Sequence, residues 1–263
     1  LYLYGMKIFP GLFISFILTN ILVRILQQKN INNPWILVIT GLMTGFPNGA
    51  YICSWYNKNN PENRLGDMLA GIINIPSPAF LISYVYINIL EKCISLPMFL
   101  ALTYIPVILC SYMAILLFRD KNNKKDNAPH IKNDKKLIFH LFEEAVDSSI
   151  NTALKLGAYV IIFSVIVNII MHFSQSNTAG LLISYLFEIS NGLAIIKNAG
   201  IPMNTTVLLT VLLDAFGGVC IIMQTKSICS SYISIKKYIY QKLVLCIVTL
   251  AMTYLLIYVL NIL

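Results

Sequence analysis

Charge is scarce in this chain. Asp, Glu, Lys and Arg together make up 11% of its 263 residues, whereas hydrophobic residues make up 57%. Soluble globular domains carry about 25% charged residues, so the composition excludes that class and indicates a polytopic membrane protein. Signals of soluble enzymes are also lacking, because the sequence has no Gly-rich nucleotide loop and no clustered acid, base and nucleophile. We therefore do not expect an enzyme.

Metal and redox motifs are missing as well. The six cysteines stand singly in or beside apolar runs, and His130, His140 and His172 do not have the spacing of metal ligands. We expect the cysteines to be packing residues, and we expect no metal and no cofactor. The first residues lack the basic region and cleavage site of a signal peptide, and we expect the natural chain to begin before Leu1.

The net charge of +8 does not indicate a nucleic acid partner. The lysines lie mainly between apolar segments, where the cytoplasmic loops of a membrane protein carry basic residues. The partner that this pattern predicts is the lipid bilayer. The sequence leaves open whether the protein forms a homo-oligomer.

Eight apolar segments are long enough to be membrane helices, since about 20 apolar residues cross ~30 Å of hydrocarbon. Four are uninterrupted: 8–25, 94–118, 153–173 and 238–262. Four contain polar or helix-disrupting residues: 35–56, 68–90, 179–196 and 203–224. The order is plain, broken, broken, plain, and then the same again.

The basic loops orient these segments. The loop 119–136 contains seven basic and three acidic residues, and a second basic loop contains Lys226, Lys236, Lys237 and Lys242. Both loops are expected in the cytoplasm. That topology requires one broken segment in each half to return to its own side, and we assign these re-entrant hairpins to 35–56 and 179–196. The two halves then form an inverted-topology repeat with discontinuous transmembrane helices.

Three regions follow from this order within an all-α polytopic membrane protein. Residues 1–118 form the first repeat, as span, hairpin, broken span and span. Residues 119–152 form a cytoplasmic basic loop and an amphipathic helix, in which apolar residues recur at helical spacing from Ile138 to Ile150. Residues 153–263 form the second repeat in the same order.

The helix breaks are the candidate functional features. Non-helical backbone at membrane depth survives only where protein or a watery cavity covers it, so the breaks should face inward. Half-helix N-termini there attract anions, and half-helix C-termini attract cations. The residues that make the breaks are Gly45, Pro47, Gly49, Pro78, Gly192, Gly217 and Gly218.

Two acids lie within apolar segments, Glu188 in LISYLFEISNGL and Asp214 in TVLLDAFGGV. A charge at the centre of a membrane helix costs about 2.5 to 3.5 kcal/mol, so each acid needs a partner, a proton or water. One interpretation is that an acid binds substrate or a coupling proton or cation, with Ser190, Asn191 or Gln224. The other is a structural hydrogen bond to a neighbouring break.

Several of these motifs resemble those of a known family. They are the turn GFPNGA at 45–50, the break FEISNG at 187–192, the break FGG at 216–218 with Gln224 after it, and the Ile235…Tyr238 start of the last span. In this order they are similar to the YlbJ-type sporulation integral membrane proteins. These belong to the nucleoside-recognition (Gate) group, which is related to concentrative nucleoside transporters. The resemblance extends over nearly the whole chain.

The resemblance implies a stage V sporulation transporter in the bacterial cell membrane. It would move dipicolinic acid, a flat aromatic dianion, from the mother cell across the mother-cell-derived outer forespore membrane. The chain departs from the family at 73–78, INIPSP, where several hydroxyl and amide side chains are lost. Two alternatives therefore stay open, a Na⁺- or proton-coupled nucleoside transporter and a non-transporting sporulation scaffold.

The expected substrate site combines polar residues from the breaks of both halves. The substrate is expected to be a small organic anion, and a coupling proton or Na⁺ is left open. The predicted substrate-binding residues are Asn48, Asn74, Ser77, Glu188, Ser190, Asn191, Asp214 and Gln224.

Overall fold

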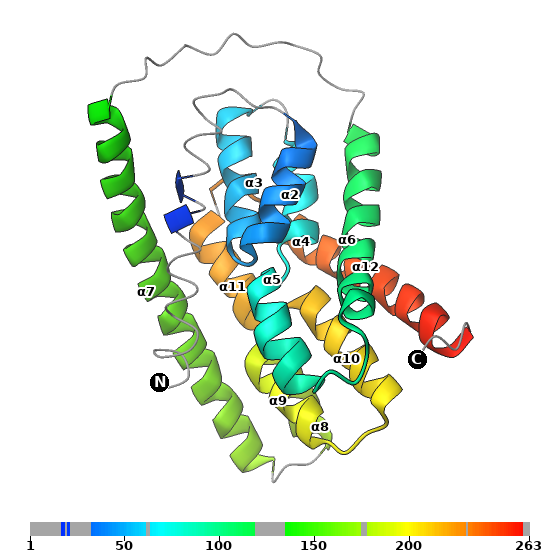
Figure 1. Cartoon of the computed structure of the whole chain (residues 1–263). Helices are drawn as coiled ribbons and strands as arrows, with labels where there is room; N and C mark the ends of the chain where they lie inside the picture. The colour runs from blue at the N-terminus through cyan, green and yellow to red at the C-terminus, as the bar shows by residue number, and fades with distance from the viewer. Residues whose placement is uncertain are drawn as a thin grey trace.

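The computed structural model describes residues 17–18, 20–21, 33–61, 64–118, 135–174, 178–229 and 231–259. Every regular element among these residues is a helix (Figure 1), which confirms the all-α class. The predicted span 8–25 and the basic loop 119–136 lie largely outside the described residues. Residues 17–18 and 20–21 are helical, and the side-chain amide of Asn20 donates to Ser149 Oγ at 3.0 Å.

The first half consists of short helices followed by one long helix. Helices α2 (Pro34–Thr44) and α3 (Asn48–Asn59) are joined by a tight turn, and α4 (Leu65–Ile73) follows. After a non-helical stretch, α5 (Pro78–Phe80) continues into a π-helix, η2 (Leu81–Ile89), and α6 (Leu96–Phe118) ends the half. Proline begins both α2 and α5, because a first-turn residue needs no backbone N–H.

The second half also contains short helices, which lie between two long ones. It begins with α7 (Lys135–Phe173), then α8 (Thr178–Phe187), α9 (Ile189–Asn198), α10 (Met203–Phe216) and α11 (Gly218–Cys229). Helix α12 (Ile235–Tyr254) continues into the π-helix η3 (Leu255–Val259) and crosses the bundle obliquely (Figure 1). Helix α7 runs without a break through the boundary between the predicted regions 119–152 and 153–263, and no proline interrupts it.

Five helices in the described part of the chain are long and apolar enough to cross a membrane. They are Leu65–Ile89, Leu96–Phe118, Ser149–Phe173, Met203–Cys229 and Ile235–Ile257. These correspond to the predicted segments 68–90, 94–118, 153–173, 203–224 and 238–262, and they indicate an integral membrane protein. The helices α2, α3, α8 and α9 have 10 to 12 residues each, about 18 Å at most, so none alone spans a bilayer.

Helix α12 has the inside-out pattern of a membrane helix. Its buried face carries the polar residues Tyr238, Gln241, Lys242, Thr249 and Thr253. Its exposed face is largely apolar, with Leu243, Ile247 and Leu250 among its residues. A helix in water would show the reverse arrangement. The distribution of polar and apolar residues therefore supports the assignment of α12 as a membrane-spanning helix.

The buried apolar residues of the broken helices belong to two separate hydrophobic cores. The first core contains residues of α2, α3, α4, α11 and the start of α12, including Ile52, Leu69 and Cys229. The second contains residues of η2, α9, α10 and η3, including Leu81, Leu193 and Val211. In the first half α4 lies in the first core and η2 in the second. In the second half the order is opposite, because most buried residues of α10 lie in the second core, whereas Ala215 at its end and Cys229 of α11 lie in the first. The breaks consequently lie where the two cores meet.

Candidate functional site

The break in the first half is covered by the turn between α2 and α3. Helix α4 ends at Ile73, residues 74–77 are not helical, and the Ser77 hydroxyl caps α5 by accepting from the Phe80 N–H at 3.3 Å. A Cβ atom on Gly45 would lie 2.7 Å from Ser77 Cα, and one on Gly49 would lie 2.8 Å from the Ile73 carbonyl oxygen. Glycine at these two positions lets the turn pack directly on the broken backbone.

The break in the second half is covered in a similar way, by the junction of α8 and α9. Helix α10 ends at Phe216. Its C-cap residue, Gly217, has a left-handed φ of 82° and donates its N–H to the Leu213 carbonyl at 2.7 Å. Gly218 starts α11 with a φ of 87°, and a Cβ there would lie 3.2 Å from the Phe187 carbonyl oxygen. A Cβ on Gly192 would lie 2.6 Å from Leu213 Cδ2. In both halves a junction of two short helices therefore packs against the break of the next broken helix.

Aromatic side chains connect the GFPNGA turn to the FEISNG junction. The Phe46 and Phe80 ring centroids are 6.4 Å apart, and those of Phe80 and Tyr84 are 5.1 Å apart. The Tyr84 hydroxyl then donates to the Ser190 carbonyl at 3.5 Å. A chain of side-chain contacts thus links the two junctions.

Glu188 is the N-cap of α9 and is 3% exposed. Its two carboxylate oxygens accept from the backbone N–H groups of Ser190 at 3.1 Å and Asn191 at 2.8 Å. The chain itself therefore supplies an anion to this half-helix N-terminus, as the helix dipole favours. The side-chain amide of Asn191 points to α7, where it donates to Ser164 Oγ at 3.5 Å.

Asn74 joins three helices at the first break. Its Oδ1 accepts from the Ala50 N–H of α3 at 3.3 Å, and its Nδ2 donates to Thr225 Oγ1 of α11 at 3.3 Å and to the Tyr238 hydroxyl of α12 at 2.8 Å. The side chain is fully buried. These hydrogen bonds fix the non-helical backbone at the break relative to α3, α11 and α12. They also occupy the Asn74 amide with protein partners.

Three of the predicted residues have polar side-chain atoms with weak or no partners among the described residues. Both carboxylate oxygens of Asp214 and the Nδ2 atom of Asn48 are buried without a hydrogen bond there. The Gln224 amide donates only to the sulfur of Cys220, at 3.2 Å. A buried donor or acceptor without a partner costs about 1–3 kcal/mol, so such groups mark places where a ligand, proton or water improves stability.

Lys242 is a central residue that the sequence analysis counted in a basic loop as well as in the predicted span 238–262, and the structure places it in the span. The side chain is fully buried within α12. Its ammonium donates to the Asn74 carbonyl at 2.5 Å and to the Ala215 carbonyl at 2.8 Å, one beside each break. The signal that would have found it is the helical spacing of Tyr238, Gln241 and Lys242 with Thr249 inside an apolar span.

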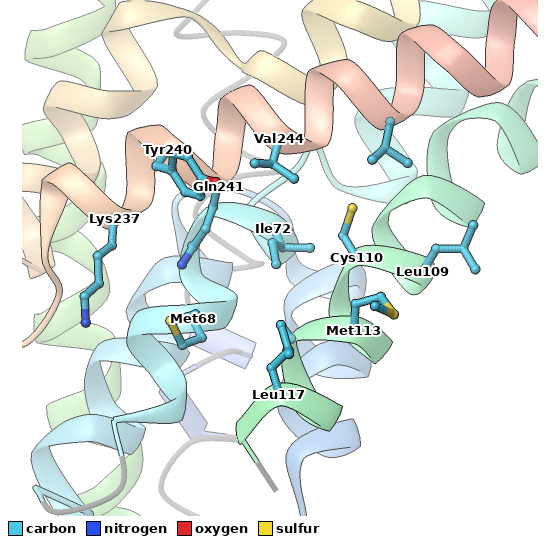
Figure 2. Close-up of a pocket in the computed structure, with 12 residues that line it drawn as sticks. Met68, Ile72, Leu109, Cys110, Met113, Leu117, Lys237, Tyr240, Gln241 and Val244 are labelled. Carbon is cyan, nitrogen blue, oxygen red and sulfur yellow. The ribbon is translucent and has the colours of Figure 1, made fainter.

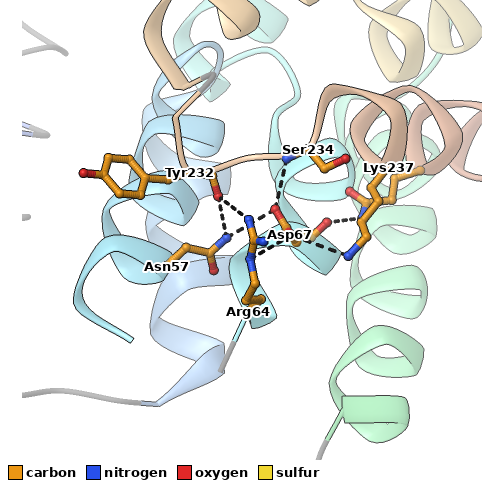
Figure 3. A network of polar contacts seen from close by, with 7 residues as sticks. Asn57, Arg64, Asp67, Tyr232, Ser234 and Lys237 are labelled. Atoms are coloured by element: carbon orange, nitrogen blue, oxygen red, sulfur yellow. Dashed lines mark hydrogen bonds and ion pairs between the residues drawn. The ribbon is translucent and has the colours of Figure 1, made fainter. Parts of the chain in front are cut away.

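Asp67, which the sequence analysis did not single out, ties α4 to α12 at one end of the bundle (Figure 3). The carboxylate is 1% exposed and pairs with Arg64 Nε at 3.2 Å and Lys237 Nζ at 3.5 Å. It also accepts from the Ser234 N–H at 3.1 Å and the Asn57 amide at 3.3 Å. These contacts set the position of α12, and therefore of Lys242, relative to α4.

A separate cavity of about 510 Å³ lies between α4, α6 and α12 (Figure 2). Its lining is mainly apolar, with Met68, Ile72, Met113 and Leu117 on its walls and Lys237 at its edge. None of the predicted substrate residues lines it. Its lining suits hydrocarbon, and the polar breaks do not open into it.

Within the described residues, no group of three or more His, Cys, Asp or Glu side chains is placed to hold a metal ion. The chain matches no protein-family model, no curated protein and no solved structure.

Proposed function

We propose that this protein is a membrane transporter of a small organic anion. The substrate that the family resemblance suggests is dipicolinate, carried across the outer forespore membrane during sporulation. The observation that carries the proposal is the opposite division of the two broken helices between the two cores, because it buries both breaks at one boundary in the middle of the protein.

The same division supports an inverted-topology repeat. In the first half the first piece of the broken helix, α4, packs in the core that also holds α11, and in the second half the first piece, α10, packs in the core that also holds η2. Two halves of opposite orientation produce this exchange, as in many secondary transporters. The pairs α2–α3 and α8–α9, each too short to span, are then the two re-entrant hairpins.

The chemistry at the breaks favours a negatively charged ligand. Helices α3 and α5 both begin where Gly45 meets Ser77, so their N-termini lie together. The buried Asn48 amide at the start of α3 has an Nδ2 donor without a partner among the described residues. On the other side the Glu188 carboxylate already occupies the N-terminus of α9. A carboxylate of the substrate at Asn48 would be the counterpart of Glu188 in the first half.

Transport by the reconstituted full-length protein tests the proposal. Proteoliposomes should take up labelled dipicolinate faster than empty liposomes and should not take up uridine. Asn48→Leu should lower this uptake at least about tenfold, because one lost hydrogen bond to a charged group is worth about 1.5–3 kcal/mol. The melting temperature should stay equal or rise, since the substitution removes a buried Nδ2 donor that has no partner among the described residues. Asn59→Leu, at the exposed end of the same helix, is the matched control and should leave uptake unchanged.

The alternatives give different results in the same experiment. Uridine uptake driven by a Na⁺ or proton gradient, without dipicolinate uptake, would identify a nucleoside carrier. Absence of both activities in correctly inserted protein would refute transport and favour a membrane scaffold.

A further inference from the structure

One ammonium group holds the ends of both broken helices. Lys242 Nζ donates to the Asn74 carbonyl, just after α4, and to the Ala215 carbonyl, in the last turn of α10. The ring centroid of Tyr238, one turn earlier on α12, lies 5.9 Å from Nζ. The ring is in turn oriented by the hydrogen bond from Asn74 to its hydroxyl.

These neighbours form an environment for a cation. Carbonyl groups at a helix C-terminus carry the negative end of the helix dipole, and an aromatic face attracts positive charge as well. In the described part of the chain no carboxylate lies within 4 Å of Nζ. The ammonium of Lys242 therefore faces carbonyl dipoles and a π face. Carbonyls of unwound helices are also the groups that hold a free alkali ion in transporters.

We infer that Lys242 is a tethered monovalent cation: its ammonium fills a carbonyl site between α4 and α10 that would otherwise take a free ion such as Na⁺ or K⁺. The inference concerns how the two breaks are held together and does not depend on the substrate. Combined with the proposed transport function, it has one consequence. A cation that is covalently attached cannot be released on the other side of the membrane, so this junction does not couple transport to a Na⁺ gradient.

Two substitutions separate a cation site from simple packing. Lys242→Ala removes the ammonium and leaves space, and n-propylammonium has the size of the atoms removed. Lys242→Met removes the charge but fills much of the space. The full-length protein is purified in detergent, and its melting temperature is measured in choline chloride, NaCl, KCl and n-propylammonium chloride at equal ionic strength.

In choline, both variants should melt about 5 °C or more below the wild type, because two buried carbonyls lose their donors. Propylammonium, Na⁺ or K⁺ should recover at least half of this loss in Lys242→Ala but not in Lys242→Met. Equal stability of both variants and the wild type in choline would overturn the inference. A loss in Lys242→Ala that no cation reverses would also overturn it, because it would indicate packing alone.

The wild type provides a second measurement, with Lys242→Met as its control. Its melting temperature should be the same in choline, Na⁺ and K⁺. A stabilisation specific to Na⁺ or K⁺ that Lys242→Met abolishes would show that a free ion binds at this junction, and would overturn the inference. These readouts are independent of transport, so failure of the proposed substrate leaves them interpretable.

Discussion

Gly45→Ala should destabilise the protein strongly, and the structure separates two causes. Gly45 has φ 72° and ψ −176°, a region that is essentially restricted to glycine and costs another residue about 1–3 kcal/mol. In addition, the new Cβ atom would lie 2.7 Å from Ser77 Cα, closer than real Cβ atoms approach other atoms. The overlap is with backbone atoms of Ser77, which is part of the first break, so it can be relieved only if the turn and the break move apart.

Gly200→Ala is a matched control for the backbone cost. Gly200 also has a left-handed φ, 62°, but a Cβ there meets no atom within 4 Å. It should cost about 1 kcal/mol, or about 2–4 °C in melting temperature for a protein of this size. Gly45→Ala should cost at least about 3 kcal/mol, or roughly 6–12 °C, since strain and overlap act together.

Thermal unfolding of both variants, purified in the same detergent, measures this difference, and hydrogen exchange of the residues 74–77 locates it. Faster exchange of these amides in Gly45→Ala, but not in Gly200→Ala, is expected. Equal melting temperatures for the two variants would refute the packing of the α2–α3 turn on the first break, and with it the buried site at that break.

Three further substitutions test other parts of the structure. Asp67→Ala removes a buried carboxylate with four partners and should cost roughly 2–3 kcal/mol in thermal unfolding, less than a fully buried pair because Arg64 is half exposed; a cost no larger than that of an ordinary surface substitution would contradict the role of Asp67 in joining α4 to α12. Glu188→Gln should weaken the cap of α9 by about 1 kcal/mol and reduce dipicolinate uptake in proteoliposomes without preventing insertion; normal uptake would remove Glu188 from the mechanism. The hydrogen bond and charge of Lys197 lower the pKa of Glu91, so this pair contributes above the ordinary glutamate pKa and its contribution disappears as the pH falls through the lowered value. Since Glu91 is exposed, Glu91→Gln should lower the melting temperature only slightly at pH 7 and not at all below the lowered pKa or in high salt, and a large effect would contradict that exposure.

The positions of the helices and of their breaks could be predicted from local sequence. An apolar run of about 20 residues has few alternatives to a membrane helix, because its backbone groups must be satisfied within the segment. Gly217 and the pair Ser77–Pro78 identify where two of these helices are interrupted, since a left-handed φ and a missing N–H are properties of single residues. The continuity of α7 was not predicted, because an amphipathic stretch and an apolar span were interpreted as separate helices.

The partners of the site residues could not be predicted in this way. Asn74 was expected to bind substrate, but its amide is taken up by Ala50, Thr225 and Tyr238, two of which are more than 150 residues away. Glu188 was recognised as an acid that needs a partner, and that partner turned out to be the backbone of its own helix. A hydrogen-bond requirement is visible in the sequence, whereas the group that meets it is not.

By itself, the sequence determined that the protein is all helical, where its membrane helices lie and which of them are broken, because apolar length and backbone conformation depend on neighbouring residues. Only the tertiary structure decided that Lys242 lies between the two breaks. Burial of that ammonium depends on carbonyl groups 168 and 27 residues away, which meet it only after α4, α10 and α12 have packed together.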